Sequence, residues 1–242
     1  MEHILVHTQK EWDAVPNSYR GIIFISSKGN DFILIKTRKG FPIVSWGSQV
    51  KVIGNAWVSA RGEALIIADE NSSVSVCGTV KVFAYGNSTI TGSEDVCIVA
   101  KGNSRITITD GVILEALENS YVYAHGFTSV TARDNAVIVA DDSSSVEAWD
   151  KAIVYAHGST HIVAGNNTFI YLNGDGEIEA SDNVTVLARG KAQIEAWDEV
   201  VVSAYDNVHV LVKSESVHVA LNDKASRSDD FHDIYHEQEG ET

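Results

Sequence analysis

Apolar and polar residues alternate along most of this chain, and the pattern restarts every eight residues. Residues 136–159 read AVIVADDS, SSVEAWDK and AIVYAHGS, and residues 176–207 read GEIEASDN, VTVLARGK, AQIEAWDE and VVVSAYDN. The register holds from Ser48 to Asp223, which gives 22 octads without an insertion.

Each position of the octad has its own chemistry. Position 1 is small or β-branched, position 3 is nearly always Val or Ile, position 5 is mostly Ala, and positions 7 and 8 are Gly, Asp, Asn, Ser or Glu. Side chains at positions 1, 3 and 5 lie on one side of a strand. Gly, Asn and Asp tolerate the positive φ of tight corners. Each octad therefore predicts a short strand and a two-residue corner, and octads must stack into a solenoid to bury their apolar side.

The outward positions indicate how many strands form one coil. Glu recurs at position 4 in residues 115, 147, 179 and 195, Tyr recurs there in residues 123, 155 and 171, and all separations within each set are multiples of 16. A coil of three octads would scatter the Glu residues over three faces. We therefore predict an all-β fold, a two-sheeted β-solenoid (β-helix) in which each coil consists of two octads, about 16 residues. About 11 coils would form a rod of roughly 53 Å.

The two ends depart from the octad pattern. Residues 1–47 are expected to form a small N-terminal capping segment, with a short helix over 9–15 that begins at a capping box of Thr8 and Glu11. Strands are expected at 21–27 and 31–37. The solenoid spans 48–223, and residues 224–242, with two basic and six acidic side chains, are expected to form an acidic mobile tail. In the last coil, His218 takes the inward position 3.

The two outward faces differ in polarity. Over six neighbouring coils, ten of twelve outward residues at positions 2 and 4 are apolar or aromatic on one face, which we call the aromatic face. On the opposite face, the glutamate face, two of twelve are apolar. An apolar patch of this size is typical of an interface, and we expect a second copy of the chain to cover it, giving a homodimer or higher even oligomer. The expected interface residues are Tyr121, Tyr123, Val137, Val139, Ile153, Tyr155, Phe169, Tyr171 and Leu187.

A polar row at position 6 borders the aromatic face and consists of His125, Asp141, His157, Asn173 and Arg189. Two histidines and a carboxylate suit a proton-transfer or metal cluster, although hydrogen bonding along the row is the interpretation we favour. The same row is a candidate rim for a small ligand, such as a nucleotide, that stacks on the Tyr and Phe side chains.

The glutamate face raises the alternative of a glycan-active enzyme. Trp149 and Trp197 lie beside Glu147 and Glu195, and aromatic rings with paired carboxylates are typical of glycosidases. These two sets are three coils apart, about 14 Å, whereas Glu179 and Glu195 are one coil apart. Two-residue corners provide no loops for a cleft, so we predict a protein that is not an enzyme and that needs no cofactor or metal. Asp and Asn at the corners are explained by turn geometry, since the calcium-binding Gly-Gly-x-Gly-x-Asp pattern does not occur.

Charge and composition limit the classes of partner that the protein can bind. The net charge is −15, and residues 48–223 carry 23 acidic and 10 basic side chains. This excludes direct binding to nucleic acid backbones or anionic membranes, but it leaves open an acidic DNA mimic that inhibits a DNA-binding protein. No run of 18 apolar residues and no secretory leader is found, so we expect a cytoplasmic protein. Cys77 and Cys97 fall on opposite faces and are not expected to form a disulfide.

The octads DNAVIVAD, SSVEAWDK, DNVTVLAR and KAQIEAWD resemble the (G/D)-(N/S)-A-x-V-x-A-(W/R/Y) octapeptide-repeat proteins of phages and bacteria. The opening TQKEWDAVPNSY resembles the T-Q-x-E-W-D-A-L-P segment that precedes such repeats. The resemblance covers nearly the whole chain and brings no catalytic motif. It implies a non-catalytic binding protein, expected in the cytoplasm of a bacterial host, that occupies or sequesters a protein or small ligand, in the manner of a phage counter-defence protein.

Overall fold

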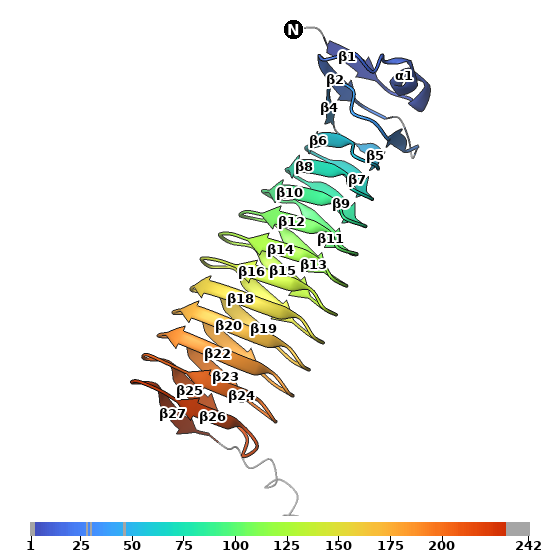
Figure 1. Cartoon of the computed structure of the whole chain (residues 1–242). Coiled ribbons are helices and arrows are strands. Elements are labelled where there is room, and N and C mark those ends of the chain that lie inside the picture. Colours follow the sequence, from blue (N-terminus) through green and yellow to red (C-terminus); the bar gives the residue numbers. More distant parts are fainter. Residues whose placement is uncertain (1–2, 28, 30, 46, 231–242) are drawn as a thin grey trace, which may run out of the picture.

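Two parallel sheets, wound from one continuous chain, form a long rod in the computed structural model of this protein (Figure 1). The structure describes residues 3–27, 29, 31–45 and 47–230. Within these residues the chain makes about 14 turns of a β-solenoid. The predicted fold class is therefore confirmed, with more turns than the octads alone indicate.

Successive strands alternate between the two sheets, so that strands two apart in sequence pair side by side. Among the described residues, the 14-stranded sheet contains β1 (His3–Val6), β2 (Ile22–Ile25), β4 (Phe41–Val44), β6 (Trp57–Arg61), β8 (Ser73–Cys77), β10 (Thr89–Ser93), β12 (Arg105–Ile108), β14 (Tyr121–Ala124), β16 (Val137–Ala140), β18 (Ile153–Gly158), β20 (Phe169–Gly174), β22 (Thr185–Gly190), β24 (Val201–Ala204) and β26 (His218–Leu221). The 13-stranded sheet contains β3 (Ile33–Ile35), β5 (Ser48–Val52), β7 (Ala64–Ala68), β9 (Val80–Ala84), β11 (Cys97–Ala100), β13 (Ile113–Ala116), β15 (Ser129–Ala132), β17 (Ser145–Ala148), β19 (His161–Ala164), β21 (Glu177–Ala180), β23 (Gln193–Ala196), β25 (His209–Val212) and β27 (Ser226–Asp229).

Strand pairing follows the predicted coil of two octads. Tyr123 of β14 pairs with Val139 of β16, and Val139 pairs with Tyr155 of β18. Alternate residues point inward, where Val and Ile fill the middle of each strand and Ala lies next to the corners. Ile138 and Ala140, for example, are both fully buried. The apolar core is thus a continuous column between the two sheets, which no single coil could bury alone.

Acidic side chains line one edge of the rod, at the corners that follow the strands of the 13-stranded sheet. Asp134 and Asp150 adopt φ of 58° and 64°, a region in which Asp and Asn are the most frequent residues apart from Gly. The Asp134 carboxylate accepts a hydrogen bond from the backbone N–H of Glu118 at 3.0 Å, and the Asp150 carboxylate accepts one from the N–H of Asp134 at 3.2 Å. The same bond recurs at Asn166, Asp182 and Asp198. These corner residues therefore serve turn geometry and coil-to-coil bonding, as the sequence interpretation holds.

The N-terminal segment, expected to cap the solenoid, adds further strands to its two sheets and carries the expected short helix. Strands β1, β2 and β4 continue the 14-stranded sheet, and their coils are longer than two octads, as the pairing of Ile22 with Phe41 shows. The expected helix is α1 (Gln9–Ala14), and the Thr8 hydroxyl accepts a hydrogen bond from the N–H of Glu11 at 3.3 Å. Trp12 of α1 is buried, so the helix covers the end of the core.

Gln9 of α1 protects the end of the 13-stranded sheet. Its side-chain Nε2 donates to the carbonyl oxygen of Leu34 at 3.2 Å, and its Oε1 accepts from the Leu34 N–H at 2.6 Å. Leu34 lies in β3, the first strand of this sheet. The side-chain amide thus takes the place of a neighbouring strand and satisfies backbone groups that would otherwise be open to edge-to-edge pairing.

The C-terminal end contains an insertion that the octad register misses. His218 pairs with Val201, one residue further back than two octads, and Val217 is buried while His218 is exposed. The predicted inward position of His218 is therefore wrong, because one extra residue between Val212 and Val217 shifts every side chain of β26 to the opposite side. Strand β27 (Ser226–Asp229) lies in the segment expected to be a mobile tail and pairs with β25. Residues 231–242 of that tail lie outside the described residues.

Candidate functional site

The nine predicted interface residues lie on the outer side of five consecutive strands of the 14-stranded sheet. They are Tyr121 and Tyr123 on β14, Val137 and Val139 on β16, Ile153 and Tyr155 on β18, Phe169 and Tyr171 on β20, and Leu187 on β22. Their side chains stand in columns because parallel pairing puts equivalent positions of successive coils beside one another. The structure therefore brings all of them together in one patch.

Large apolar groups in this patch remain open to solvent. Tyr123 is 43% exposed and Tyr155 is 42% exposed, and Phe169 and Val201 are also exposed. Burial of such groups against another surface is favourable by about 25 cal/mol for each Å² of apolar area removed from water. Association through the aromatic face would therefore remove apolar area from water over several consecutive strands.

The tyrosines form two local pairs. The rings of Tyr121 and Tyr123 meet edge to face, with centroids 4.9 Å apart, and the rings of Tyr155 and Tyr171 lie 6.5 Å apart. A side-chain hydrogen bond with Tyr123, with a smaller contribution from burial, raises the pKa of Tyr121. The Tyr121 hydroxyl is therefore neutral across the physiological pH range, since even the ordinary pKa of tyrosine is about 10.

The polar row beside the patch divides into separate contacts instead of forming one cluster. His125 Nδ1 lies 3.0 Å from Asp141 Oδ2, in agreement with the favoured interpretation of bonding along the row. His157 contacts the edge of the Tyr171 ring, with centroids 6.4 Å apart, and its backbone pairs with that of Asn173. Among the described residues, no group of three or more His, Cys, Asp or Glu side chains is placed to hold a metal ion.

Tyr205 belongs to this row and was not among the predicted residues. The guanidinium of Arg189 lies over its ring, 4.5 Å from the centroid, which is close enough for a cation–π interaction. The signal for Tyr205 is present in the sequence, since it follows Arg189 by one coil of two octads. At this end of the row, the Arg189 guanidinium therefore stacks on the Tyr205 ring beside the patch.

The glutamate face carries a small hollow. A hollow of ≈ 190 Å³ is lined in part by Glu177, Glu179, Glu195 and His209 on β21, β23 and β25. Glu179 and Glu195 are direct neighbours on adjacent strands, as the sequence predicts, and His161 Nε2 lies 3.7 Å from Glu179 Oε1.

Trp149 and Trp197 lie one residue beyond the ends of β17 and β23, on strands separated by β19 and β21. A Cβ added to Gly165 would lie 2.5 Å from Cζ3 of Trp149, so this indole packs against the Gly165 backbone. The two Trp side chains therefore belong to separate coils, and Trp149 fills the gap that the glycine leaves in its column. Cys77 and Cys97 are free and lie in different sheets, as expected.

Comparisons with known proteins find no match: no protein-family model, curated protein or solved structure is significantly similar to this chain. In the described part of the chain, no helix is long and apolar enough to span a membrane.

Proposed function

We propose that this protein is a non-catalytic binding solenoid that pairs with a second copy through its aromatic face and acts by occupying a partner. The observation that carries the proposal is the patch of half-buried and exposed Tyr, Phe, Val, Ile and Leu side chains on β14 to β22. Exposed apolar patches of several hundred Å² on a protein surface usually belong to an interface. β-propensity alone would favour such residues on both faces, and the glutamate face over the same coils has no comparable patch.

The size of the patch fits a dimer that dissociates readily. The six neighbouring strands of the aromatic face from β14 to β24, spaced by about 4.8 Å and each about 17 Å wide from position 2 to position 6, give roughly 500 Å² of flat sheet on each copy. Stable interfaces bury about 600–1,000 Å² on each partner. Side chains that project from the sheet add accessible surface to the flat area, which brings this face to the lower end of that range. We therefore expect a dimer whose population depends on concentration in the micromolar range.

The opposite face limits the assembly to a closed pair. Glu177, Glu179 and Glu195 are grouped on it, and like charges facing one another across an interface oppose association. A two-fold contact between aromatic faces buries the same patch on both copies and leaves both glutamate faces in solvent. Asp141 and Arg189 would then belong to the polar rim that surrounds most interface cores.

Native mass spectrometry together with sedimentation velocity tests the proposal. We expect the wild type to be a dimer at tens of micromolar, and Tyr155→Asp/Tyr171→Asp to be a monomer with an unchanged far-UV circular dichroism spectrum. The control is Val163→Asp, which places one such charge on β19, between these two strands in sequence but in the other sheet. A dimer is expected to persist in this control. A wild type that stays monomeric at about 100 µM, or a double variant that still dimerises, contradicts self-association.

A further inference from the structure

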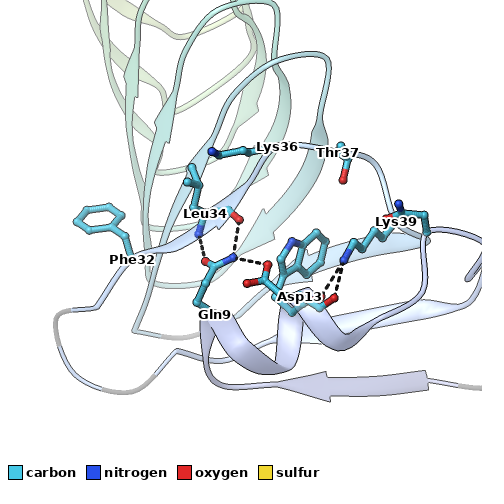
Figure 2. A pocket seen from close by; sticks show the side chains of 9 residues that line it. Gln9, Asp13, Phe32, Leu34, Lys36, Thr37 and Lys39 are labelled. Atoms are coloured by element: carbon cyan, nitrogen blue, oxygen red, sulfur yellow. Dashed lines mark hydrogen bonds between the residues drawn. The ribbon is translucent and has the colours of Figure 1, made fainter.

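A hollow of ≈ 660 Å³ lies at the N-terminal end of the rod, where α1 meets β3 and the segment that follows it (Figure 2). Trp12 and Asn17 line it from the helix side, and Phe32, Lys36, Thr37 and Lys39 line it from the other side. This end of the chain differs in charge from the rest. Residues 1–47 carry six basic and four acidic side chains, in a protein whose net charge is −15.

Lys39 places a positive charge inside the wall of the hollow. Only 6% of its surface is exposed, and Figure 2 shows its side chain reaching toward the end of α1. Its Nζ donates to the carbonyl oxygens of Trp12 at 3.0 Å and Asp13 at 3.3 Å, and lies 5.4 Å from the centroid of the Trp12 ring.

No carboxylate of the described residues lies within 4.0 Å of this ammonium group. Buried charges are normally paired with an opposite charge, because removing an ion from water is costly. Carbonyl dipoles compensate only part of that cost, and an ammonium group has three N–H donors, of which two are used here. An anion that enters the hollow would supply the missing opposite charge.

Further donors line the same hollow. Lys36 and Thr37 are exposed, and neither side chain has a hydrogen-bond partner among the described residues. Asp13 contributes the negative charge of the lining, and its Oδ1 already accepts a hydrogen bond from Gln9 Nε2 at 2.8 Å. Two lysines and a threonine therefore outnumber the single carboxylate and provide donors for an oxyanion.

An apolar group lines the same side of the hollow as these donors. Phe32 is 39% exposed and stands on the far side of Gln9 from Lys39 in Figure 2. An exposed ring beside a cationic wall suits a ligand that is apolar and flat at one end and negatively charged at the other.

We propose that this hollow binds a small oxyanion, a phosphate or carboxylate, that carries an aromatic ring. The oxyanion contacts Lys36 and Thr37 near the buried charge of Lys39, and the ring packs against Phe32. The site is separate from the aromatic face, so it does not depend on the proposed self-association.

Isothermal titration calorimetry on the full chain tests this inference with phenyl phosphate, benzoate, inorganic phosphate and phenol as probes. We expect one molecule of phenyl phosphate or benzoate to bind per chain, at least tenfold more tightly than phenol or inorganic phosphate. Whichever of phenyl phosphate and benzoate binds with the higher affinity identifies the oxyanion class. Binding should weaken as salt increases, because the attraction is electrostatic.

Lys36→Ala is the decisive variant, because the Lys36 side chain is exposed and makes no hydrogen bond or ion pair with the described residues. We expect it to weaken binding by about tenfold or more, the size of one lost charge-assisted hydrogen bond, while Lys36→Arg retains binding. Lys151→Ala removes the same charge from an exposed corner far along the rod and should have no effect. The proposal is overturned if no probe binds at about 10 mM. It is also overturned if phenol binds as tightly as the aromatic anions, or if Lys36→Ala binds like the wild type.

Discussion

Asp134 tests what holds the acidic edge of the rod together, because its hydrogen bond and its charge can be separated. Its carboxylate accepts a hydrogen bond from the N–H of Glu118 at 3.0 Å, and its φ is 58°. Asp134→Asn keeps the acceptor oxygen and the tolerance of positive φ but removes the charge. Asp134→Ala removes all three. Asn166 shows that an amide fits the column, since its Oδ1 accepts from the N–H of Asp150 at 3.1 Å.

The expected magnitudes follow from these contacts. A solvent-exposed hydrogen bond to the backbone contributes about 1 kcal/mol, and placing Ala at positive φ costs about 1 kcal/mol more. Against this, each neighbouring carboxylate, about 5 Å away along the column, repels Asp134 by about 0.8 kcal/mol in water. We therefore expect Asp134→Ala to lower the free energy of unfolding by about 1 kcal/mol, because the relieved repulsion offsets part of the two losses of about 1 kcal/mol each. Asp134→Asn loses the charged acceptor but relieves the repulsion, and we expect a change within about 0.5 kcal/mol.

Urea unfolding followed by far-UV circular dichroism measures both variants, with equal m-values as the condition for comparing midpoints. The experiment is repeated at about 0.05 M and about 0.5 M NaCl, because repulsion between exposed carboxylates is screened by salt. The wild type should gain more stability from salt than Asp134→Asn. If Asn destabilises as much as Ala, the negative charge itself holds the column and the hydrogen-bond argument is wrong. If Ala is harmless, the backbone bond contributes nothing.

Three further predictions concern the inside, the end and the pH dependence of the rod. The buried hydroxyl of Ser104 has no hydrogen-bond partner in the described structure, so Ser104→Ala should raise the urea midpoint slightly. Ser144→Ala instead removes hydrogen bonds of 2.8 and 3.2 Å to carbonyl oxygens and should lower the free energy of unfolding by about 1 kcal/mol. Replacing Gln9 by Ala exposes the edge of β3, and hydrogen exchange of the β3 amide that it binds should accelerate about tenfold, with little change in the middle of the rod. The hydrogen bond to Asp230 raises the pKa of Lys213, so this pair contributes its full stability below the unfolded pKa of about 10.4 and loses it as pH rises through the folded value. The difference in urea midpoint between the wild type and Lys213→Met should accordingly vanish at high pH.

Coil length and the division into faces could be predicted from the sequence, because inward and outward positions obey different constraints. Inward positions tolerate only residues that fill the narrow core, such as Ile138 and Ala140, and so they reveal the strands. Outward positions are free to vary, and recurrence there, as at Tyr123 and Tyr155, reveals which strands share a sheet. The spacing of two octads that results matches the pairing of β14, β16 and β18.

The sequence-based placement of His218 is wrong because the octad register changes within a polar segment. The extra residue before Val217 lies in the run KSES, whose composition suits a corner of either length, so the octads placed His218 on the wrong side. The alternation of Val217, His218 and Val219 that follows did not expose the shift. On this sheet Val137 and Val139 both point outward on either side of the inward Ile138. Two Val residues that flank His218 were therefore compatible with an inward His218.

The N-terminal hollow escaped the sequence argument for a different physical reason. Its residues come from the segments 9–17 and 32–39, which no repeat spacing relates. The run TRKG at residues 37–40 resembles an exposed basic turn, yet Lys39 is buried because the helix carbonyls of Trp12 and Asp13 bind its ammonium group. Such a contact depends on the packing of two irregular segments, and only the structure reveals it.

The solenoid architecture also determines which surface features indicate a function. A side chain on the rod has its neighbours two octads away in sequence, so a patch arises only when several coils independently hold similar residues. The aromatic face meets that condition from Tyr121 on β14 to Leu187 on β22, whereas the neighbouring Glu179 and Glu195 involve two coils. Chance pairs are expected wherever outward residues vary freely, but agreement over consecutive coils requires a common constraint. The inward residues already satisfy the fold, and the proposed second copy that covers the aromatic face would supply such a constraint.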